Sequence, residues 1–151
     1  MKKLHFDIVI HASRVAVWEA MLAPDTYRQW TAEFAAGSYY EGRWAEGERI
    51  RFLVPKGDGM FSLVAACRPH EFLSLKHLGE IKGGVEDPDS EASRSWANAF
   101  ENYSFADAGS ATRLDIDVDA APEFEDFMTR VWPKALGKLK AICEAGSAKA
   151  R

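Results

Sequence analysis

The sequence predicts an α+β fold in which a curved antiparallel sheet of six to seven strands wraps on a long C-terminal helix. The first observation is a series of short segments with apolar residues at alternate positions, separated by turn residues at hairpin spacing. The second is residues 124–143, where apolar residues recur three and four apart and form one wide helical stripe. Because this helix alone is large enough to cover one face of the sheet, we expect two layers, with room for a cavity where they part.

Composition indicates a folded domain. The chain has 151 residues, of which 47% are hydrophobic and 28% charged, both near the average of globular domains. We assign residues 1–145 to one domain and expect the small, polar residues 146–151 to form a frayed tail. Aromatic residues, at 12% of the chain, are the one excess.

The N-terminal part is predicted to form a strand and two helices. Apolar residues alternate with polar ones over residues 4–10, as in a half-buried strand. Ser13 can cap the next helix, because its hydroxyl accepts a hydrogen bond from a first-turn amide. Pro24 ends that helix, and a short second helix around Trp30 ends near Gly37.

The middle of the chain is predicted to form an antiparallel meander. Its strands are residues 38–41, 50–54, 60–67 and 72–78. Residues 79–93 are rich in Gly, Asp, Glu and Ser and are predicted as one long loop, a kind of segment that is often functional or mobile. A last hairpin, residues 96–105 and 113–119, precedes the C-terminal helix.

Charge and cysteine usage restrict the partners. The net charge is −4 and no run of Lys and Arg is present, so we expect no nucleic-acid binding. Cys67 and Cys143 lie in apolar patterns and are predicted as small buried residues, which suits a reducing cytoplasm. No stretch reaches about 18 consecutive apolar residues, so no membrane span is expected.

The common signatures for nucleotide, hydrolase and zinc sites do not occur, so we predict no catalytic residue, metal or cofactor. His5, Asp7 and His11 share the solvent-facing side of the first strand. A metal site is not expected there, because residues six apart on a strand are roughly 20 Å apart.

Two titratable residues are placed by strand parity. His77 has the same strand parity as Leu75, so both side chains lie on one face of the strand. This face either borders the cavity or lies outward and covers a second surface. If Tyr103 pairs with Leu114, then Glu101 pairs with Ile116 and faces inward, where a carboxylate can act as an acid or a ligand anchor. A register slip of one residue would place Glu101 in solvent instead.

Large side chains near the expected gap between helix and sheet are either core or cavity lining. The tryptophans are most simply core residues, and Phe124 and Phe127 fall on the core stripe of the last helix. The candidate ligand-binding residues are Trp30, Phe52, Leu75, His77, Glu101, Tyr103, Phe127 and Trp132.

Short motifs occur in a characteristic order. They are Val15-x-Val17-Trp18, Pro24 followed by Trp30, Glu41-Gly42-x-Trp44-x-x-Gly47, Pro69-x-x-Phe72-Leu73-Ser74, Trp96-x-x-x-x-Glu101-Asn102-Tyr103 and Trp132-Pro133-x-x-Leu136-x-Lys138-Leu139. This set resembles the START-like (SRPBCC) superfamily over residues 1–145. Within it, the chain is similar to the family named after the activator of the heat-shock-90 chaperone ATPase.

The resemblance implies a helix-grip fold with a cavity between the sheet and the C-terminal helix. The superfamily binds lipids, steroids, polyketides and plant hormones, some members are cyclases or hydroxylase subunits, and no invariant catalytic set can be carried over. Three functions therefore stay open. The first is binding of a small hydrophobic molecule, the second is a co-chaperone-like interaction module with a chaperone as partner, and the third is an enzyme of cyclase or hydrolase type.

Overall fold

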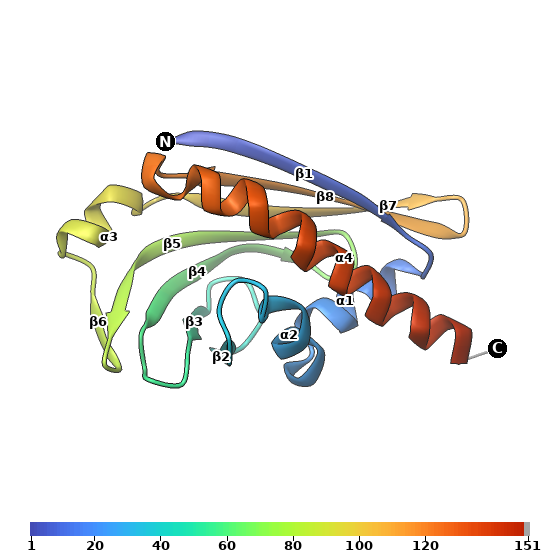
Figure 1. The fold of residues 1–151 in the computed structure, drawn as a ribbon, viewed down its shortest axis with the longest axis horizontal. Helices are drawn as coiled ribbons and strands as arrows, with labels where there is room; N and C mark the ends of the chain where they lie inside the picture. Colours follow the sequence, from blue (N-terminus) through green and yellow to red (C-terminus); the bar gives the residue numbers. More distant parts are fainter. Residues whose placement is uncertain (150–151) are drawn as a thin grey trace.

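A curved antiparallel sheet with one long helix across its concave side makes up the structure, a computed structural model that describes residues 1–149 (Figure 1). In chain order the elements are β1 (Lys2–Ile10), α1 (Arg14–Leu22), α2 (Pro24–Thr31), β2 (Tyr39–Gly42), β3 (Arg49–Leu53), β4 (Gly59–Arg68), β5 (Phe72–Lys82), β6 (Val85–Asp87), α3 (Glu91–Trp96), β7 (Phe100–Ala108), β8 (Ala111–Ala120), a 3₁₀ turn η1 (Pro122–Phe124) and α4 (Glu125–Lys149). The predicted α+β class is therefore confirmed.

The sheet has eight strands in the described residues, one more than the predicted upper number. Its order is β1-β8-β7-β5-β4-β3-β2, and β6 pairs with β5 beside this path. The pairings are antiparallel. The first and last strands of the chain thus lie side by side, and the meander folds away from them toward α2 (Figure 1).

Both predicted N-terminal helices form. Ser13 accepts a hydrogen bond from the Ala16 amide at 3.1 Å, which caps α1. Pro24 stands at the first turn of α2, where its missing amide proton costs no helical hydrogen bond. It therefore both separates the two helices and starts the second. That helix ends at Thr31, earlier than the predicted end near Gly37.

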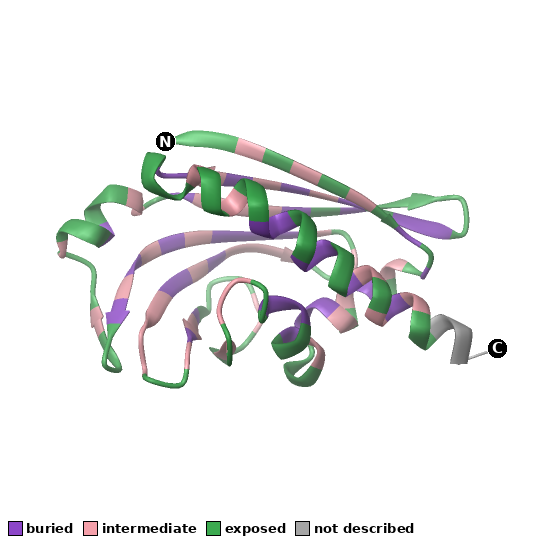
Figure 2. Ribbon diagram, viewed as in Figure 1, coloured by how far each residue is buried: buried purple, intermediate pink, exposed green. Residues whose placement is uncertain are grey.

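The core lies between α4, α1 and the concave face of the sheet. On β8, Leu114, Ile116 and Val118 are buried, whereas the residues between them are more exposed, as the sequence alternation predicts (Figure 2). The buried stripe of α4 includes Trp132 and Leu139. Figure 2 shows this stripe as purple bands along a helix whose outer side is green.

Cys143 is buried, as predicted, and burial raises the pKa of its thiol to about 11. Cys67 is half-buried rather than fully enclosed. The backbone is helical through Lys149, past Gly146, where the frayed tail was expected to begin. Fraying of residues 146–149 stays a prediction, and residues 150–151 lie outside the described residues.

The predicted long loop over residues 79–93 is wrong. Strand β5 continues to Lys82, and Gly83 and Gly84, both with positive φ, form the two-residue turn that pairs Lys82 with Val85. Helix α3 follows and ends at Trp96, which the sequence placed at the start of a strand. Of the described helices, none is long and apolar enough to span a membrane.

Candidate functional site

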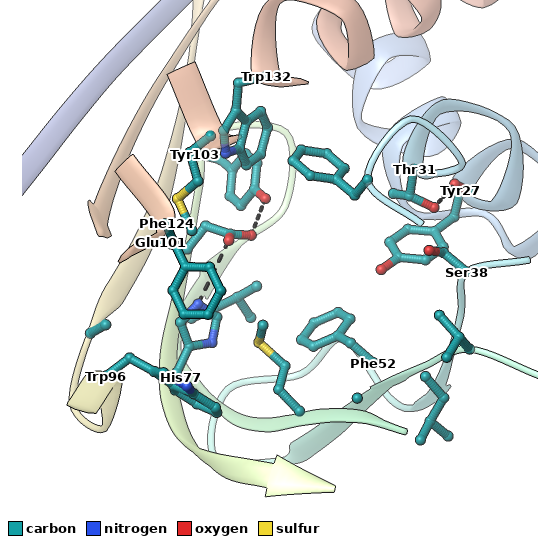
Figure 3. Close-up of a pocket in the computed structure, with 18 of the residues that line it drawn as sticks. Tyr27, Thr31, Ser38, Phe52, His77, Trp96, Glu101, Tyr103, Phe124 and Trp132 are labelled. Atoms are coloured by element: carbon teal, nitrogen blue, oxygen red, sulfur yellow. Dashed lines mark hydrogen bonds and ion pairs between the residues drawn. The ribbon is translucent and has the colours of Figure 1, made fainter. Parts of the chain in front are cut away.

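A cavity of about 480 Å³ lies between the concave face of the sheet, α2 and the start of α4 (Figure 3). Its walls come from strands β2, β3, β4, β5, β7 and β8, from helices α1, α2, α3 and α4, and from residues between these elements. This volume is within the range of small-molecule sites, roughly 300–1,000 Å³. The predicted gap between helix and sheet is therefore present as a cavity.

The structure brings all the predicted lining residues together around this cavity. They are Trp30, Phe52, Leu75, His77, Glu101, Tyr103, Phe127 and Trp132. Further lining residues that sequence reasoning did not select include Tyr27, Phe34, Trp44, Met60, Trp96 and Phe124.

The aromatic residues of the wall also pack against one another. The Trp132 ring lies 4.8 Å from Phe34 and 6.1 Å from Tyr103, measured between ring centroids. Trp30 is buried, and its indole Nε1 donates to the Met21 carbonyl at 3.0 Å. Trp30 and Trp132 are thus at once core residues and cavity lining, so these two interpretations of the sequence are compatible.

A polar group interrupts the apolar wall on β5 and β7. Tyr103 donates a hydrogen bond to Glu101 Oε2, and His77 Nε2 lies 3.6 Å from Glu101 Oε1. On the other side of the imidazole, Nδ1 lies 2.7 Å from Ser62 Oγ, and Ser62 has no exposed surface. Figure 3 shows His77, Glu101 and Tyr103 in a row along one wall of the cavity. We call Glu101, His77 and Tyr103 the polar cluster.

Strand register places the polar cluster inward. Tyr103 pairs with Ile116 and Glu101 with Val118, two residues away from the expected partners. The shift arises because the hairpin turns at Gly109 and Ser110, so that Ala108 pairs with Ala111. A shift of two residues keeps the face of each side chain, so the predicted inward direction of Glu101 is correct although its partner was wrong.

Two of the tyrosines that line the cavity, Tyr27 and Tyr103, stay protonated. Burial raises the pKa of Tyr103 well above its usual value, and the negative charge of Glu101 raises it further. Burial, followed by the charge of Glu101 and by Tyr40, has the same effect on the pKa of Tyr27. Each tyrosine therefore offers a hydroxyl donor at neutral pH.

Phe124 and Phe127 were predicted on the core stripe of the last helix, and this placement is wrong. Phe124 is 40% exposed and Phe127 36%, yet both line the cavity. They belong to η1 and the first turn of α4. Both rings thus touch the cavity and solvent, as residues at an entrance do.

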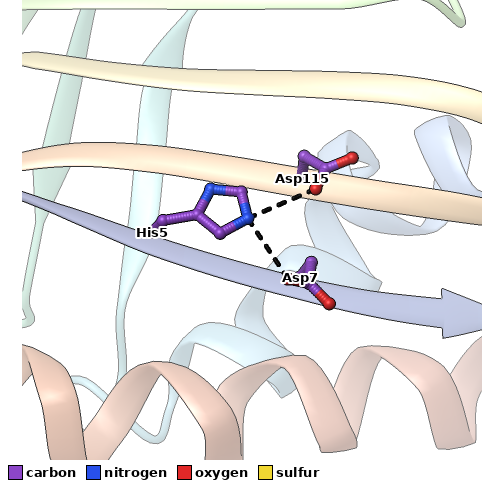
Figure 4. A group of neighbouring side chains, drawn as sticks. All are labelled: His5, Asp7 and Asp115. Carbon is purple, nitrogen blue, oxygen red and sulfur yellow. Dashed lines mark hydrogen bonds and ion pairs between the residues drawn. The ribbon is translucent and has the colours of Figure 1, made fainter.

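A second group of possible ligand atoms lies on the exposed face of β1 and β8 (Figure 4). His5, Asp7 and Asp115 each bring one donor atom within 4.8 Å of the others. Arg113 already pairs with both carboxylates, at 3.5 Å from Asp7 Oδ2 and 3.1 Å from Asp115 Oδ2. The group is therefore an ion-pair network, and His11 is not part of it.

Several proteins of known structure are similar to this chain in fold. No family model and no curated protein matches the sequence. The Aha1 dimer from Colwellia psychrerythraea is similar with a TM-score of 0.71 and 19% identity, covering 97% of this chain and 98% of that chain. Protein MLL2253 from Mesorhizobium loti has a TM-score of 0.73 and 15% identity, covering 95% and 98%. The AHSA1-like protein from Aeromonas hydrophila has a TM-score of 0.63 and 17% identity, covering 95% and 94%.

Identities this low establish a shared architecture and not a shared activity. The curved antiparallel sheet and the long C-terminal helix are those that the sequence motifs implied. The chain has the helix-grip fold of the Aha1 and AHSA1-like proteins.

Proposed function

We propose that this protein binds a small, mostly apolar molecule in the cavity between sheet and helix. The observation that carries the proposal is a cavity of about 480 Å³ with an aromatic wall and one polar cluster. Apolar walls favour the transfer of an apolar ligand from water, and a few fixed polar groups orient it. Phe124 and Phe127 provide the entrance.

A neutral fluorescent probe tests this proposal. N-phenyl-1-naphthylamine gains fluorescence in apolar surroundings, and we expect saturable binding with one probe per chain. Leu75 lines the cavity and is 2% exposed, so Leu75→Phe extends a side chain into the free space. This variant should weaken binding about tenfold, a loss of about 1.4 kcal/mol.

The matched control is Val9→Leu, which enlarges an exposed residue of β1 outside the cavity. This variant should bind the probe like the wild type. Binding that does not saturate, or that Leu75→Phe leaves unchanged, would contradict the proposal.

The exposed apolar residues do not favour an interaction module. An interaction surface is expected to gather such residues into one patch. Within the described chain the large exposed ones are Met1, Val9, Val15, Val85, Phe124 and Phe127. The two phenylalanines line the cavity, and the others are spread over the N-terminus, β1, α1 and β6.

Acid–base catalysis on the bound molecule is a second candidate function, favoured by the 3.6 Å approach of His77 to Glu101 within the cavity wall. Such catalysis needs an acid or base within reach of the substrate. Hydrolysis of p-nitrophenyl butyrate, compared between the wild type and His77→Gln, tests it. A rate above buffer that His77→Gln abolishes supports catalysis, and equal rates for both proteins contradict it.

A further inference from the structure

The charges around the cavity are all of one sign. Among the residues that line it within the described chain there is no lysine and no arginine, whereas Glu80, Glu101 and Asp119 supply carboxylates. Asp119 is already compensated, because its Oδ1 lies 3.3 Å from Lys3 Nζ and its Oδ2 accepts a hydrogen bond from the Phe100 amide. Glu101 has no such cation, and its partners are Tyr103 and His77.

The state of His77 decides whether the charge of Glu101 is cancelled. Ser62 has no exposed surface, and within residues 1–149 the partner of its hydroxyl is His77 Nδ1 at 2.7 Å. A serine hydroxyl can donate to an imidazole nitrogen or accept from it. If Ser62 donates to Nδ1, an imidazole proton lies on Nε2, facing Glu101.

With that tautomer, the Tyr103 hydroxyl donates to Glu101 Oε2, and the Nε2 proton of His77 faces Glu101 Oε1 across 3.6 Å. The charge of Glu101 then has no lysine or arginine of the cavity wall beside it. Only 21% of the Glu101 side chain is exposed, so solvent compensates little of this charge. A carboxylate in such surroundings is most stable beside a positive charge.

The rest of the wall suits a cation equally well. It contains four tryptophans, four phenylalanines and three tyrosines. The faces of these rings carry partial negative charge, and they attract organic cations within about 6 Å. Two of the tryptophans contact the polar cluster directly. The Trp132 ring lies 6.1 Å from Tyr103, and the Trp96 ring lies 6.3 Å from His77.

We infer that the ligand is a hydrophobic organic cation, an amine with an aromatic or alicyclic body, whose ammonium group lies at Glu101. The inference rests on the proposed function, because it concerns the same cavity and names the chemical class that the cavity takes. The ammonium group would donate to Glu101 and lie among the aromatic rings, while the apolar body fills the remaining space. An anionic amphiphile such as a fatty acid would instead meet a carboxylate with no basic residue in the wall to pair with it.

Three probes with one ring system and three charges test the inference. They are 2-naphthylmethylamine, a cation at pH 7, 2-naphthalenemethanol, which is neutral, and 2-naphthoate, an anion. Isothermal titration calorimetry of the full chain at low salt measures each affinity. We expect the amine to bind about tenfold more tightly than the alcohol, because a hydrogen bond between charged groups is stronger than a neutral one, and the naphthoate to bind most weakly.

Glu101→Gln removes the charge and keeps the shape and the hydrogen bond from Tyr103. It should reduce the affinity for the amine about tenfold and leave the affinity for the alcohol within about threefold. The control is Glu19→Gln, which removes an exposed carboxylate of α1 outside the cavity wall and should change neither affinity.

The outcomes separate the two proposals. If the alcohol or the naphthoate binds the wild type as tightly as the amine does, the cation inference is wrong and ligand binding stands. If none of the three binds, both proposals fail. The wild-type comparison decides the matter even if Glu101→Gln does not fold.

Discussion

His5 is a surface histidine surrounded by carboxylates. Its Nδ1 lies 2.9 Å from Asp117 Oδ1, and its Nε2 lies 3.2 Å from Asp7 Oδ2 and 3.3 Å from Asp115 Oδ1. The hydrogen bond to Asp117 is the main reason that the pKa of His5 is raised above its usual 6.5. Burial is the next largest effect and opposes the rise, and Asp7 and Asp115 raise the pKa further.

We predict that His5 makes the stability of the protein depend on pH. Because its pKa is higher in the folded state, the protonated ring stabilises the fold fully below about pH 6.5, and this contribution is lost as the pH rises through the folded value. The side chain is 47% exposed, so the effect is modest and screened by salt. An NMR titration should place the His5 midpoint above 6.5, and Asp117→Asn should lower it. A midpoint that Asp117→Asn leaves unchanged would contradict this assignment.

The sequence predicted the residues of the cavity wall better than it predicted the residues that they pair with or contact. Parity left both directions open for Glu101 and His77, and the structure places both in the cavity wall. The error in the partner of Glu101 did not matter, since a two-residue error in register does not change the face. Ser62 was missed because the pairing of β4 with β5 is irregular between Phe61 and Ser62, where β5 carries one extra residue, and both of these side chains are buried. No alternation of residues marks such a bulge, so the contact of Ser62 with His77 could not be predicted.

The elements differ in how strongly their residues specify them. Helix α4 was predicted because its apolar stripe extends over many turns, and β8 because three buried residues alternate with aspartates. Helix α3 has six residues, too few for a periodic pattern, and its signals are local. Ser90 accepts from the Ser93 amide, and the buried Ser93 hydroxyl accepts from the Glu80 amide. These contacts with β5 define α3. The composition of the same segment predicted a loop, because composition does not contain these contacts.

The entrance of the cavity could not be predicted from the sequence either. Residues at helical spacing were all assigned to one core stripe, but Phe124 and Phe127 reach solvent while Val131 and Trp132 are buried. Where such a stripe leaves the core depends on the curvature of the sheet, which follows from bulges and twist accumulated over the whole sheet. Helical periodicity does not contain this information.

The interior of the molecule is close-packed on one side and contains the cavity on the other. Leu114 on β8 has no exposed surface and lies in the core outside the cavity wall, whereas Leu75 on β5 is equally buried but borders the cavity. Adding volume to a filled core forces neighbouring side chains from their preferred rotamers and costs about 1–3 kcal/mol. Adding the same volume where space is free avoids this cost and gains apolar contact.

We therefore predict opposite effects for the same substitution at these two leucines. Leu114→Phe should lower the free energy of unfolding by about 1–3 kcal/mol, and Leu75→Phe should leave it unchanged or raise it by up to about 1 kcal/mol. Urea unfolding at constant pH, with the two variants and the wild type compared at equal m-values, measures both. Equal losses in the two variants would mean that Leu75 is as tightly enclosed as Leu114, and a ligand would then have to displace core side chains to enter. A loss confined to Leu114→Phe would show that the aromatic residues surround free space large enough to take the added ring, which is the physical condition for binding without refolding the core.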